Sequence, residues 1–315
     1  MRIFANPNYN FIKWRWHALI LSVVVIWSGV ATIFLRGGLQ LGIDFTGGTV
    51  VIVQFAQPTD ENVVRKALDP VAADKVVQKY GNANSREIMI RLPTTGEEQG
   101  AGLEAEATRV EQALRAANVG EFTIPHKTLV GPTVGRDLAS KGIWATLTAL
   151  GGILLYVAFR FRFTFAVGAI VAAFHDILIT LVFLAWFHYD LSLNVIAALL
   201  TITGYSVNDT IVVFDRVREN QRLLRREPLD QIVNKSVNQT LGRTVITSGA
   251  TFLAVFSLYL FGGEVLRGFA FTMLVGIVTG TYSTVFIAAA IAIILSRRPG
   301  GPVTQAQGRA RRAQG

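Results

Sequence analysis

The sequence contains no cysteine. This absence excludes a disulfide framework, a thiolate metal site and a cysteine nucleophile. Charge is scarce as well: Asp, Glu, Lys and Arg make up 16% of the 315 residues, whereas hydrophobic residues make up 51%. A soluble domain of this length carries more charge. The composition therefore indicates a membrane protein.

Two motifs are also missing. The sequence has no Walker loop, so an ATP-driven mechanism has no support. The aromatic and basic residues 1–17 are not followed by a signal-peptide cleavage site, so the first apolar run is expected to remain as an anchor. Residues 36–135 contain no cluster of metal ligands. We expect neither a cofactor nor an enzymatic activity.

Six apolar runs are each long enough to cross a bilayer. They cover residues 18–35, 139–159, 164–187, 191–214, 244–261 and 268–295. The net charge of +9 is concentrated in the polar segments beside these runs, which is a topology signal. Charge placed in this way argues against nucleic acid as a partner.

The positive-inside rule then predicts six membrane helices with both termini in the cytoplasm. The predicted order is a cytoplasmic segment 1–17, a first span 18–35, an extracytoplasmic domain 36–135, five spans within 136–295 with a cytoplasmic loop 215–243, and a disordered cytoplasmic tail 296–315. Within the loop, residues 229–240 have one apolar face. Two readings fit this face: a helix lying on the membrane surface, or a helix packed only on its own chain.

Residues 36–135 have the pattern of a small α+β domain. Strand-like runs cover 49–55, 75–80, 87–92 and 121–130, and helical patterns start at Pro58 and cover 102–118. The order β-α-β-β-α-β is that of a ferredoxin-like unit. A turn is expected at Gly81-Asn82, and Gly131 to Gly135 resembles a hinge into the second span.

Asp209 lies inside the fourth apolar run, where an ionisable group is costly to insert. Such residues normally face a bundle interior and mark a path for protons, ions or substrate. Helical spacing places Asp209 on a polar stripe that also contains Asn194, Thr201, Tyr205 and Asn208. Lipid offers no hydrogen bonds, so we expect the stripe to face other helices.

Arg243 begins the fifth apolar run on the side where the fourth run ends, so we expect it at the depth of Asp209. Low dielectric and a nearby guanidinium shift the proton affinity of a carboxylate in opposite directions. A carboxylate held between these influences can change protonation when the geometry changes. One reading is therefore a proton relay of Asp209, Arg243 and Asn208. The alternatives are a static Asp209–Arg243 pair, and an Arg243 that only anchors the helix end.

His175 and Asp176 lie in the third apolar run. Imidazole titrates near neutral pH, so a relay is one reading of this pair and a structural hydrogen-bonding role is the other. Neighbouring helical residues point about 100° apart, so we expect the two side chains not to serve one site. Thr247, one turn after Arg243, is a further candidate for a secondary polar site.

Acids in consecutive spans also occur in intramembrane aspartyl proteases. Those enzymes carry Tyr-Asp and Gly-x-Gly-Asp, and neither signature surrounds Asp176 or Asp209. In the sixth run, small residues recur at every fourth position, which lets helices approach closely and favours packing within the chain over a binding surface. These residues are Gly268, Thr272, Gly276, Gly280 and Thr284.

Three stretches resemble the signatures of a known family. They are GIDFTGG at residues 42–48, SVNDTIVVFDRVREN at 206–220 and NQTLGRT at 238–244. The first contains Gly42, Asp44, Phe45, Gly47 and Gly48. The chain is similar in these stretches to SecF, the smaller half of the SecDF protein-export factor in the RND superfamily, and the resemblance covers nearly the whole chain.

The resemblance implies an auxiliary factor of Sec-dependent export in the bacterial cytoplasmic (inner) membrane, driven by the proton motive force. It implies SecD, the SecYEG channel, translocating unfolded polypeptides and membrane lipids as partners, and protons as the coupling ion. Asp209 matches the membrane aspartate of the family's proton path, and Arg243 matches the arginine that opposes it. RND transporters have twelve spans, so a partner chain is expected to supply the rest. The alternatives are an RND-type half-transporter for lipid or drug and a passive membrane assembly scaffold.

Overall fold

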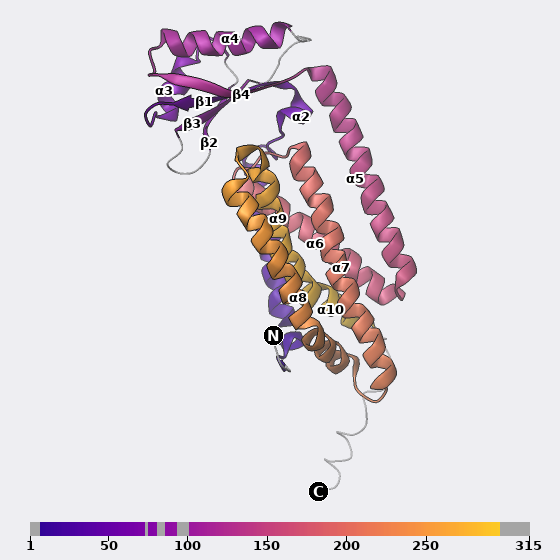
Figure 1. Ribbon diagram of the computed structural model, residues 1–315. Helices are drawn as coiled ribbons and strands as arrows, with labels where there is room; N and C mark the ends of the chain where they lie inside the picture. The colour runs from indigo at the N-terminus through magenta and orange to yellow at the C-terminus, as the bar shows by residue number, and fades with distance from the viewer. Residues whose placement is uncertain (1–6, 73–74, 81–85, 93–100, 297–315) are drawn as a thin grey trace.

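A bundle of long helices carries a small sheet domain at one end (Figure 1). The computed structural model describes residues 7–72, 75–80, 86–92 and 101–296. Within these residues, six helices are long and apolar enough to cross a membrane, which confirms the predicted number of spans. We call the end of the bundle beside the sheet the sheet end, and the opposite end the far end.

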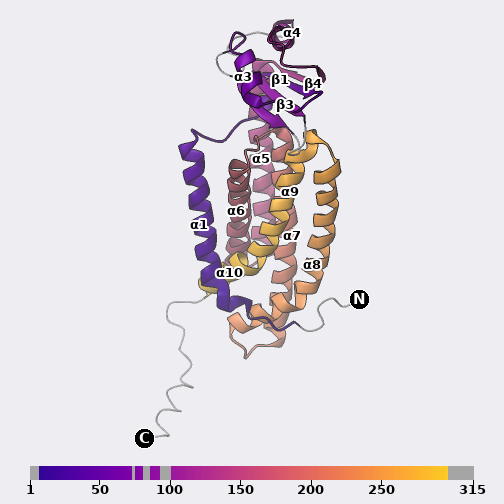
Figure 2. The ribbon, with the colours of Figure 1, turned by 90° about the vertical axis from the view of Figure 1, so that its left-hand side faces the viewer.

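The bundle helices alternate in direction between these two ends (Figure 2). They are α1 (Arg15–Leu35), which follows a short 3-10 turn (Phe11–Trp14), α5 (Pro132–Arg160), α6 (Phe163–Trp186), α7 (Leu193–Leu223), α8 (Leu229–Phe261) and α9 (Glu264–Ser283), which continues through a π turn (Thr284–Ala288) into α10 (Ala289–Ser296).

The sheet domain has the predicted ferredoxin-like order. Its elements are β1 (Gly48–Phe55), α3 (Glu61–Ala67), β2 (Val76–Tyr80), β3 (Glu87–Leu92), α4 (Ala101–Ala116) and β4 (Phe122–Val130). The strands pair antiparallel in the spatial order β2-β3-β1-β4. Alternate residues of β1 and β3, such as Val53 and Ile90, pack against Val64 of α3 and Val110 of α4 in one core. Both helices therefore cover the same face of the sheet, and its other face lies toward the bundle.

In the bundle, α9 packs on α7 through the small residues of the sixth run. A Cβ atom added at Gly276 lies 2.1 Å from the Ile202 side chain, and one added at Gly280 lies 3.0 Å from Ser206. A larger side chain at Gly276 therefore requires Ile202 to move, and one at Gly280 makes a tight contact with Ser206. The stripe of small residues is thus used for packing within the chain, as the sequence predicts.

The segment 215–243 differs from the predicted loop. Helix α7 continues to Leu223 and α8 starts at Leu229, so the connection is five residues long, and residues 229–240 belong to the same helix as the fifth span. Hydropathy reports where a helix leaves the apolar layer, whereas the backbone remains helical until a breaker. Here α7 ends at Leu223 with Leu224 as its C-cap, and Pro228 is the N-cap residue of α8.

The predicted hinge is also different. Helix α5 begins at residue 132, so Gly135 lies within its first turn. A Cβ atom there lies 2.9 Å from the backbone nitrogen of Gly47, so glycine permits a close contact between α5 and the short helix α2 (Ile43–Thr46). The predicted turn at 81–82 and almost all of the predicted tail 296–315 lie outside the described residues.

Candidate functional site

The glycine-rich motif GIDFTGG at residues 42–48 joins the sheet end of the bundle to the start of α7. The backbone N–H of Gly42 donates to the carbonyl of Leu191 at 2.8 Å. A carboxylate oxygen of Asp44 accepts from the N–H of Leu193, the first residue of α7, at 2.9 Å. An acid at a helix N-terminus satisfies a free donor and favours the helix dipole. The motif therefore fixes the helix that carries Asp209.

The remaining motif residues shape the turn. Gly47 and Gly48 have φ angles of 71° and 130°, which glycine adopts without strain. Phe45 points into an apolar cavity of about 410 Å³ between α2, α5 and α7. A second link at this end is the contact between Arg91 of β3 and Asp190 in the α6–α7 connection. Burial raises the pKa of Asp190 above 3.8, and the charge of Arg91 opposes this rise.

His175 and Asp176 form one closed polar cluster. The Nδ1 atom of His175 lies 3.0 Å from Oδ1 of Asp176, and its Nε2 atom lies 2.9 Å from the hydroxyl of Ser22 in α1. Ser206 of α7 and Ser283 of α9 donate to the other carboxylate oxygen at 2.5 and 2.8 Å. Asp176 is 0% exposed. The expectation that these neighbours do not share a site is wrong, because the Asp176 side chain bends back to the ring although the Cβ atoms diverge.

Asp209 has fewer partners. It is 5% exposed, and among the described residues only the hydroxyl of Ser248 in α8 donates to it, at 3.2 Å. Thr281 of α9 donates to Ser248 at 3.1 Å, and Tyr205 lies 3.5 Å from the same hydroxyl. The carboxylate thus lies where α7, α8 and α9 meet, held by one neutral donor.

Arg243 and Asp209 form no ion pair within the described part of the chain, where Asp209 bonds Ser248 instead. The guanidinium is exposed, and so is Thr247, whose hydroxyl donates to the carbonyl of Arg243 within α8. Thr247 is therefore not part of the His175–Asp176 cluster.

The predicted polar stripe of α7 is only partly buried. Asn194, Thr201 and Asn208 are exposed, whereas Asp209 is buried. Asn208 lies beside a shallow cavity of about 410 Å³ between α5 and α7, and no described residue hydrogen-bonds its side chain. Helix α5 diverges from the rest of the bundle (Figure 1). An amide at this depth has no hydrogen-bond partner in lipid.

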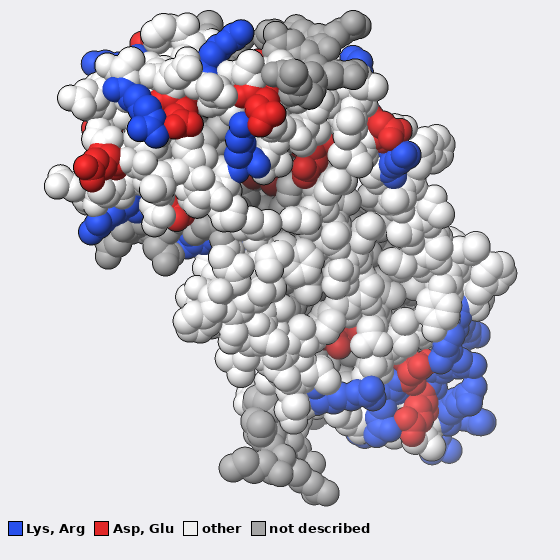
Figure 3. Space-filling view, turned by 45° about the horizontal axis from the view of Figure 1, so that its top comes forward, with Lys and Arg blue, Asp and Glu red and all other residues white. Residues whose placement is uncertain are grey.

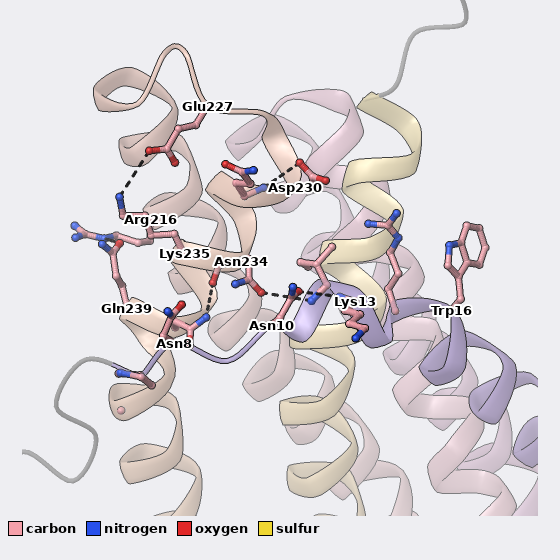
Figure 4. A pocket seen from close by; sticks show the side chains of 16 residues that line it. Asn8, Asn10, Lys13, Trp16, Arg216, Glu227, Asp230, Asn234, Lys235 and Gln239 are labelled. Carbon is pink, nitrogen blue, oxygen red and sulfur yellow. Dashed lines mark hydrogen bonds and ion pairs between the residues drawn. The ribbon is translucent and has the colours of Figure 1, made fainter. Parts of the chain in front are cut away.

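A cavity of about 1130 Å³ lies at the far end, between the N-terminal segment and α8. Figure 4 shows its lining, which includes Lys13, Arg216, Asp230 and Lys235. The side chains of Asn234 and Asn238 bond the backbone of Tyr9 and hold the N-terminal segment in place. The cavity contains acids as well as bases, and it reaches Gly242, next to Arg243.

Sequence reasoning missed the hydroxyl groups that surround the two acids. These are Ser22, Ser206, Ser248, Thr281 and Ser283. Serine and threonine are common in apolar helices, where they bond their own backbone, so composition alone does not identify them. The usable signal is position: Ser206 lies one turn before Asp209, and Ser283 directly precedes Thr284, the last residue in the stripe of small residues.

The geometry defines a multi-pass helical membrane protein with a ferredoxin-like domain after its first span and two acids buried among its spans. The family model "Protein export membrane protein SecD/SecF, C-terminal" matches residues 109–298, and the model "SecD/SecF GG Motif" matches residues 33–59. The chain belongs to the SecF family.

Curated relatives agree along the whole length. The chain is 41% identical to "Protein translocase subunit SecF" of Rhodothermus marinus, over 95% of this chain and 96% of that protein. It is 39% identical to the protein of the same name from Escherichia coli O157:H7, over 92% and 88%.

Among solved structures, the chain is similar to SecDF from Thermus thermophilus, described as a translocon-associated membrane protein, with a TM-score of 0.82 and 36% identity. A structure of SecDF in its super-membrane-facing form gives 0.66 and 34%. The first match covers 93% of this chain but only 39% of the SecDF chain, so the rest of that protein has no counterpart here.

Proposed function

We propose that this chain is the proton-coupled SecF subunit of a Sec translocase and assists export of proteins across the bacterial cytoplasmic membrane. Its family and the SecDF likeness support the role in translocation. The distribution of basic residues supports an orientation with both termini in the cytoplasm, because the far end carries most of the excess positive charge. The sheet domain then lies outside the cytoplasm.

One observation carries the proton coupling: Asp209 is buried within a membrane span, yet a single hydroxyl is its only described hydrogen-bond donor. A buried carboxylate that stays charged normally has several donors or a contacting cation. Asp209 has neither among the described residues, and Arg243 on α8 is exposed and forms no ion pair with it there. A small movement of α8 relative to α7 therefore changes which protonation state is favoured.

Three residues have distinct roles in this proposal. Asp209 binds and releases the proton. Arg243 favours the charged state when it approaches, and Asn208 lies on the exposed side of the same turn of α7, where a partner can reach it. His175 and Asp176 position the helices, because their polar atoms already have partners in α1, α7 and α9.

The open face between α5 and α7 supports a SecD-like partner in the membrane. It presents Asn208, Gly204 and Tyr156 at bilayer depth, all of them exposed. The likeness to SecDF, of which this chain spans 39%, supports a mate that supplies the other half. The SecYEG channel and the unfolded polypeptide that it exports complete the proposed assembly, and no nucleic acid or cofactor takes part.

Asp209→Asn tests this function, because the amide keeps the shape of the side chain but cannot exchange a proton. Export into sealed vesicles is measured with and without an imposed proton gradient, using the chain assembled with its partners at matched protein levels. We expect the variant to assemble normally and to lose the stimulation by the gradient. His126→Ala, at an exposed position on β4, serves as the control and keeps the stimulation. If Asp209→Asn responds to the gradient like the wild type, Asp209 is not the proton-binding group and is only a structural polar contact.

A further inference from the structure

A second cavity at the far end has an unusual concentration of one charge. It has a volume of about 740 Å³ and lies between the α5–α6 connection and the last turns of α7. Five arginines line it, and no lining residue is acidic. They are Arg160, Arg162, Arg218, Arg222 and Arg225. Figure 3 shows basic side chains gathered at this end of the molecule.

The charges converge from separate segments. Arg160 ends α5 and Arg162 caps the start of α6, whereas Arg218 and Arg222 lie one turn apart on α7. Only Arg160 has a counter-charge, since its guanidinium contacts Asp215 at 2.8 Å. The other four form no ion pair with any acid in the described parts of the chain. The positive-inside rule explains basic residues at helix ends, but it does not require them to surround one cavity.

The other wall of the cavity is aromatic. The rings of Phe161 and Phe165 pack edge-on against Phe214, with centroids 6.0 and 5.1 Å apart. Two neighbouring rings, Phe159 and Phe163, are 85% and 78% exposed at the same level, where the apolar spans end. A ligand here meets unpaired guanidinium groups on one side and apolar rings on the other.

The start of α6 adds to the positive potential. Its cap residue, Arg162, makes no side-chain hydrogen bond to the helix, so N–H groups of the first turn remain available. Helix N-termini favour anions through these groups and through the dipole. Guanidinium groups bind phosphate oxygens in a bidentate manner.

We infer that this cavity binds the phosphate of an anionic phospholipid headgroup. The arginines contact the phosphate, and the aromatic wall contacts the glycerol and the start of the acyl chains. An amphiphile fits the combination better than a soluble anion does, because the rings continue onto the lipid-facing surface. Basic pockets between transmembrane helices bind anionic headgroups in this way.

The larger far-end cavity shown in Figure 4 provides the comparison. It has basic residues too, but Arg216 pairs with Glu219 and Lys235 lies 4.0 Å from Glu227. Its lining includes the acids Glu227 and Asp230 beside its basic residues, so its positive charge is partly offset, and most of its lining side chains are polar. The inference predicts no selective binding of anionic lipid there.

The test uses the full chain, purified in an uncharged detergent, and native mass spectrometry with phosphatidylglycerol or phosphatidylcholine at equal concentration. We expect the wild type to retain phosphatidylglycerol and not phosphatidylcholine. Arg162→Gln combined with Arg222→Gln is expected to lower this occupancy roughly tenfold or more, because each basic residue contributes separately to binding. The matched control, Lys13→Gln with Lys235→Gln, removes the same charge from the other cavity and is expected to change occupancy less than about twofold.

Circular dichroism checks that each variant is folded. If the double variant unfolds, Arg222→Gln alone serves, since this side chain is exposed on α7 and its loss is expected to lower occupancy about threefold or more. Equal retention of the two lipids, or an equal loss in the matched control, overturns the inference. Displacement of the lipid by glycerol phosphate at the same concentration also overturns it and identifies a soluble anion as the ligand. None of these outcomes bears on the proton dependence of Asp209.

Discussion

Two aspartates lie in neighbouring spans, Asp176 in α6 and Asp209 in α7, and their surroundings differ. Asp176 is 0% exposed and contacts His175, Ser206 and Ser283, so both of its oxygens have partners. Asp209 has one described hydroxyl donor. The comparison teaches that burial alone does not indicate function. A fully satisfied buried network fixes helices, whereas an under-satisfied acid remains able to change its protonation state.

The surroundings of Asp176 and Asp209 are also connected, because both include residues of α7 and α9. Ser206 and Asp209 lie one turn apart on α7, and Thr281 and Ser283 contact the two sites from α9. The π turn that starts at Thr284 follows directly, and Thr284 contacts Thr210 at 2.9 Å. Such turns are common at functional sites. The His175–Asp176 cluster therefore supports the segment of α9 that contacts the surroundings of Asp209.

The largest loss of stability is expected from a substitution in the His175–Asp176 cluster. Asp176→Ala leaves the imidazole of His175 and the Ser206 hydroxyl buried without this acceptor, while Ser283 keeps the carbonyl of Gly280. Loss of one partner of a buried pair costs about 3–5 kcal/mol. Thermal unfolding in lipid nanodiscs measures this loss, and Asp209→Ala serves as the comparison with a cost of about 1–2 kcal/mol. Equal destabilisation by the two variants contradicts the claim that Asp176 is fully hydrogen-bonded and that Asp209 is not.

A smaller effect is expected where the glycine motif holds α7. Asp44→Ala removes the acceptor for the N–H of Leu193 and is expected to cost about 0.5–2 kcal/mol. Hydrogen exchange should quicken in the first turn of α7. The matched control is Asp60→Ala, which removes the cap of α3 and should quicken exchange there only. An unchanged first turn of α7 in Asp44→Ala shows that the motif does not hold this helix.

Ser248→Ala removes the described donor to Asp209 and the acceptor for Thr281, and is expected to cost about 1 kcal/mol. Gradient-stimulated export should fall more than stability does, because the environment of the carboxylate changes. Ser257→Ala on the same helix is the control, since its hydroxyl bonds only the carbonyl of Leu253. Equal export by the two variants means that Ser248 has no part in coupling.

The smallest effect is expected at the sheet end. Burial raises the pKa of Asp190 above its usual value of 3.8, so the folded state binds more protons than the unfolded state in this range. This stabilisation is present at low pH and is lost as the pH rises through the raised value. The protection of the α6–α7 connection against hydrogen exchange, taken relative to the intrinsic exchange rate at each pH, should therefore fall with rising pH in the wild type and change less in Asp190→Asn. Identical pH profiles contradict the assigned direction.

Much of the fold could be predicted because it depends on local pattern. Period-two alternation places Val51 and Val53 on one face of β1, and helical spacing places Val110 and Leu114 on one face of α4. The ferredoxin-like order follows from these elements. The ends of α7 and α8 could not be predicted by hydropathy, because the helices continue beyond the apolar layer to Leu223 and from Leu229.

The site was predictable only in part. An acid in an apolar run can be recognised in a sequence because an ionisable group is costly to insert into a membrane. Asp176 and Asp209 could therefore be identified. Their hydrogen-bond partners come from other helices and depend on helix rotation, which a single segment does not specify. The contact of His175 with Asp176 depends on side-chain rotamers. The exposure of Asn208 reflects a face that this chain does not cover by itself.

The central claim is that Asp209, and not Asp176, changes its protonation state during gradient-stimulated export. Isotope-edited infrared spectroscopy of the assembled protein in vesicles measures this directly, by following aspartate carboxyl bands while the proton gradient is switched on and off. The account predicts a gradient-dependent carboxyl signal that is absent in Asp209→Asn and persists in Asp44→Asn. A signal of full size in Asp209→Asn would contradict the account and assign the proton to another acid.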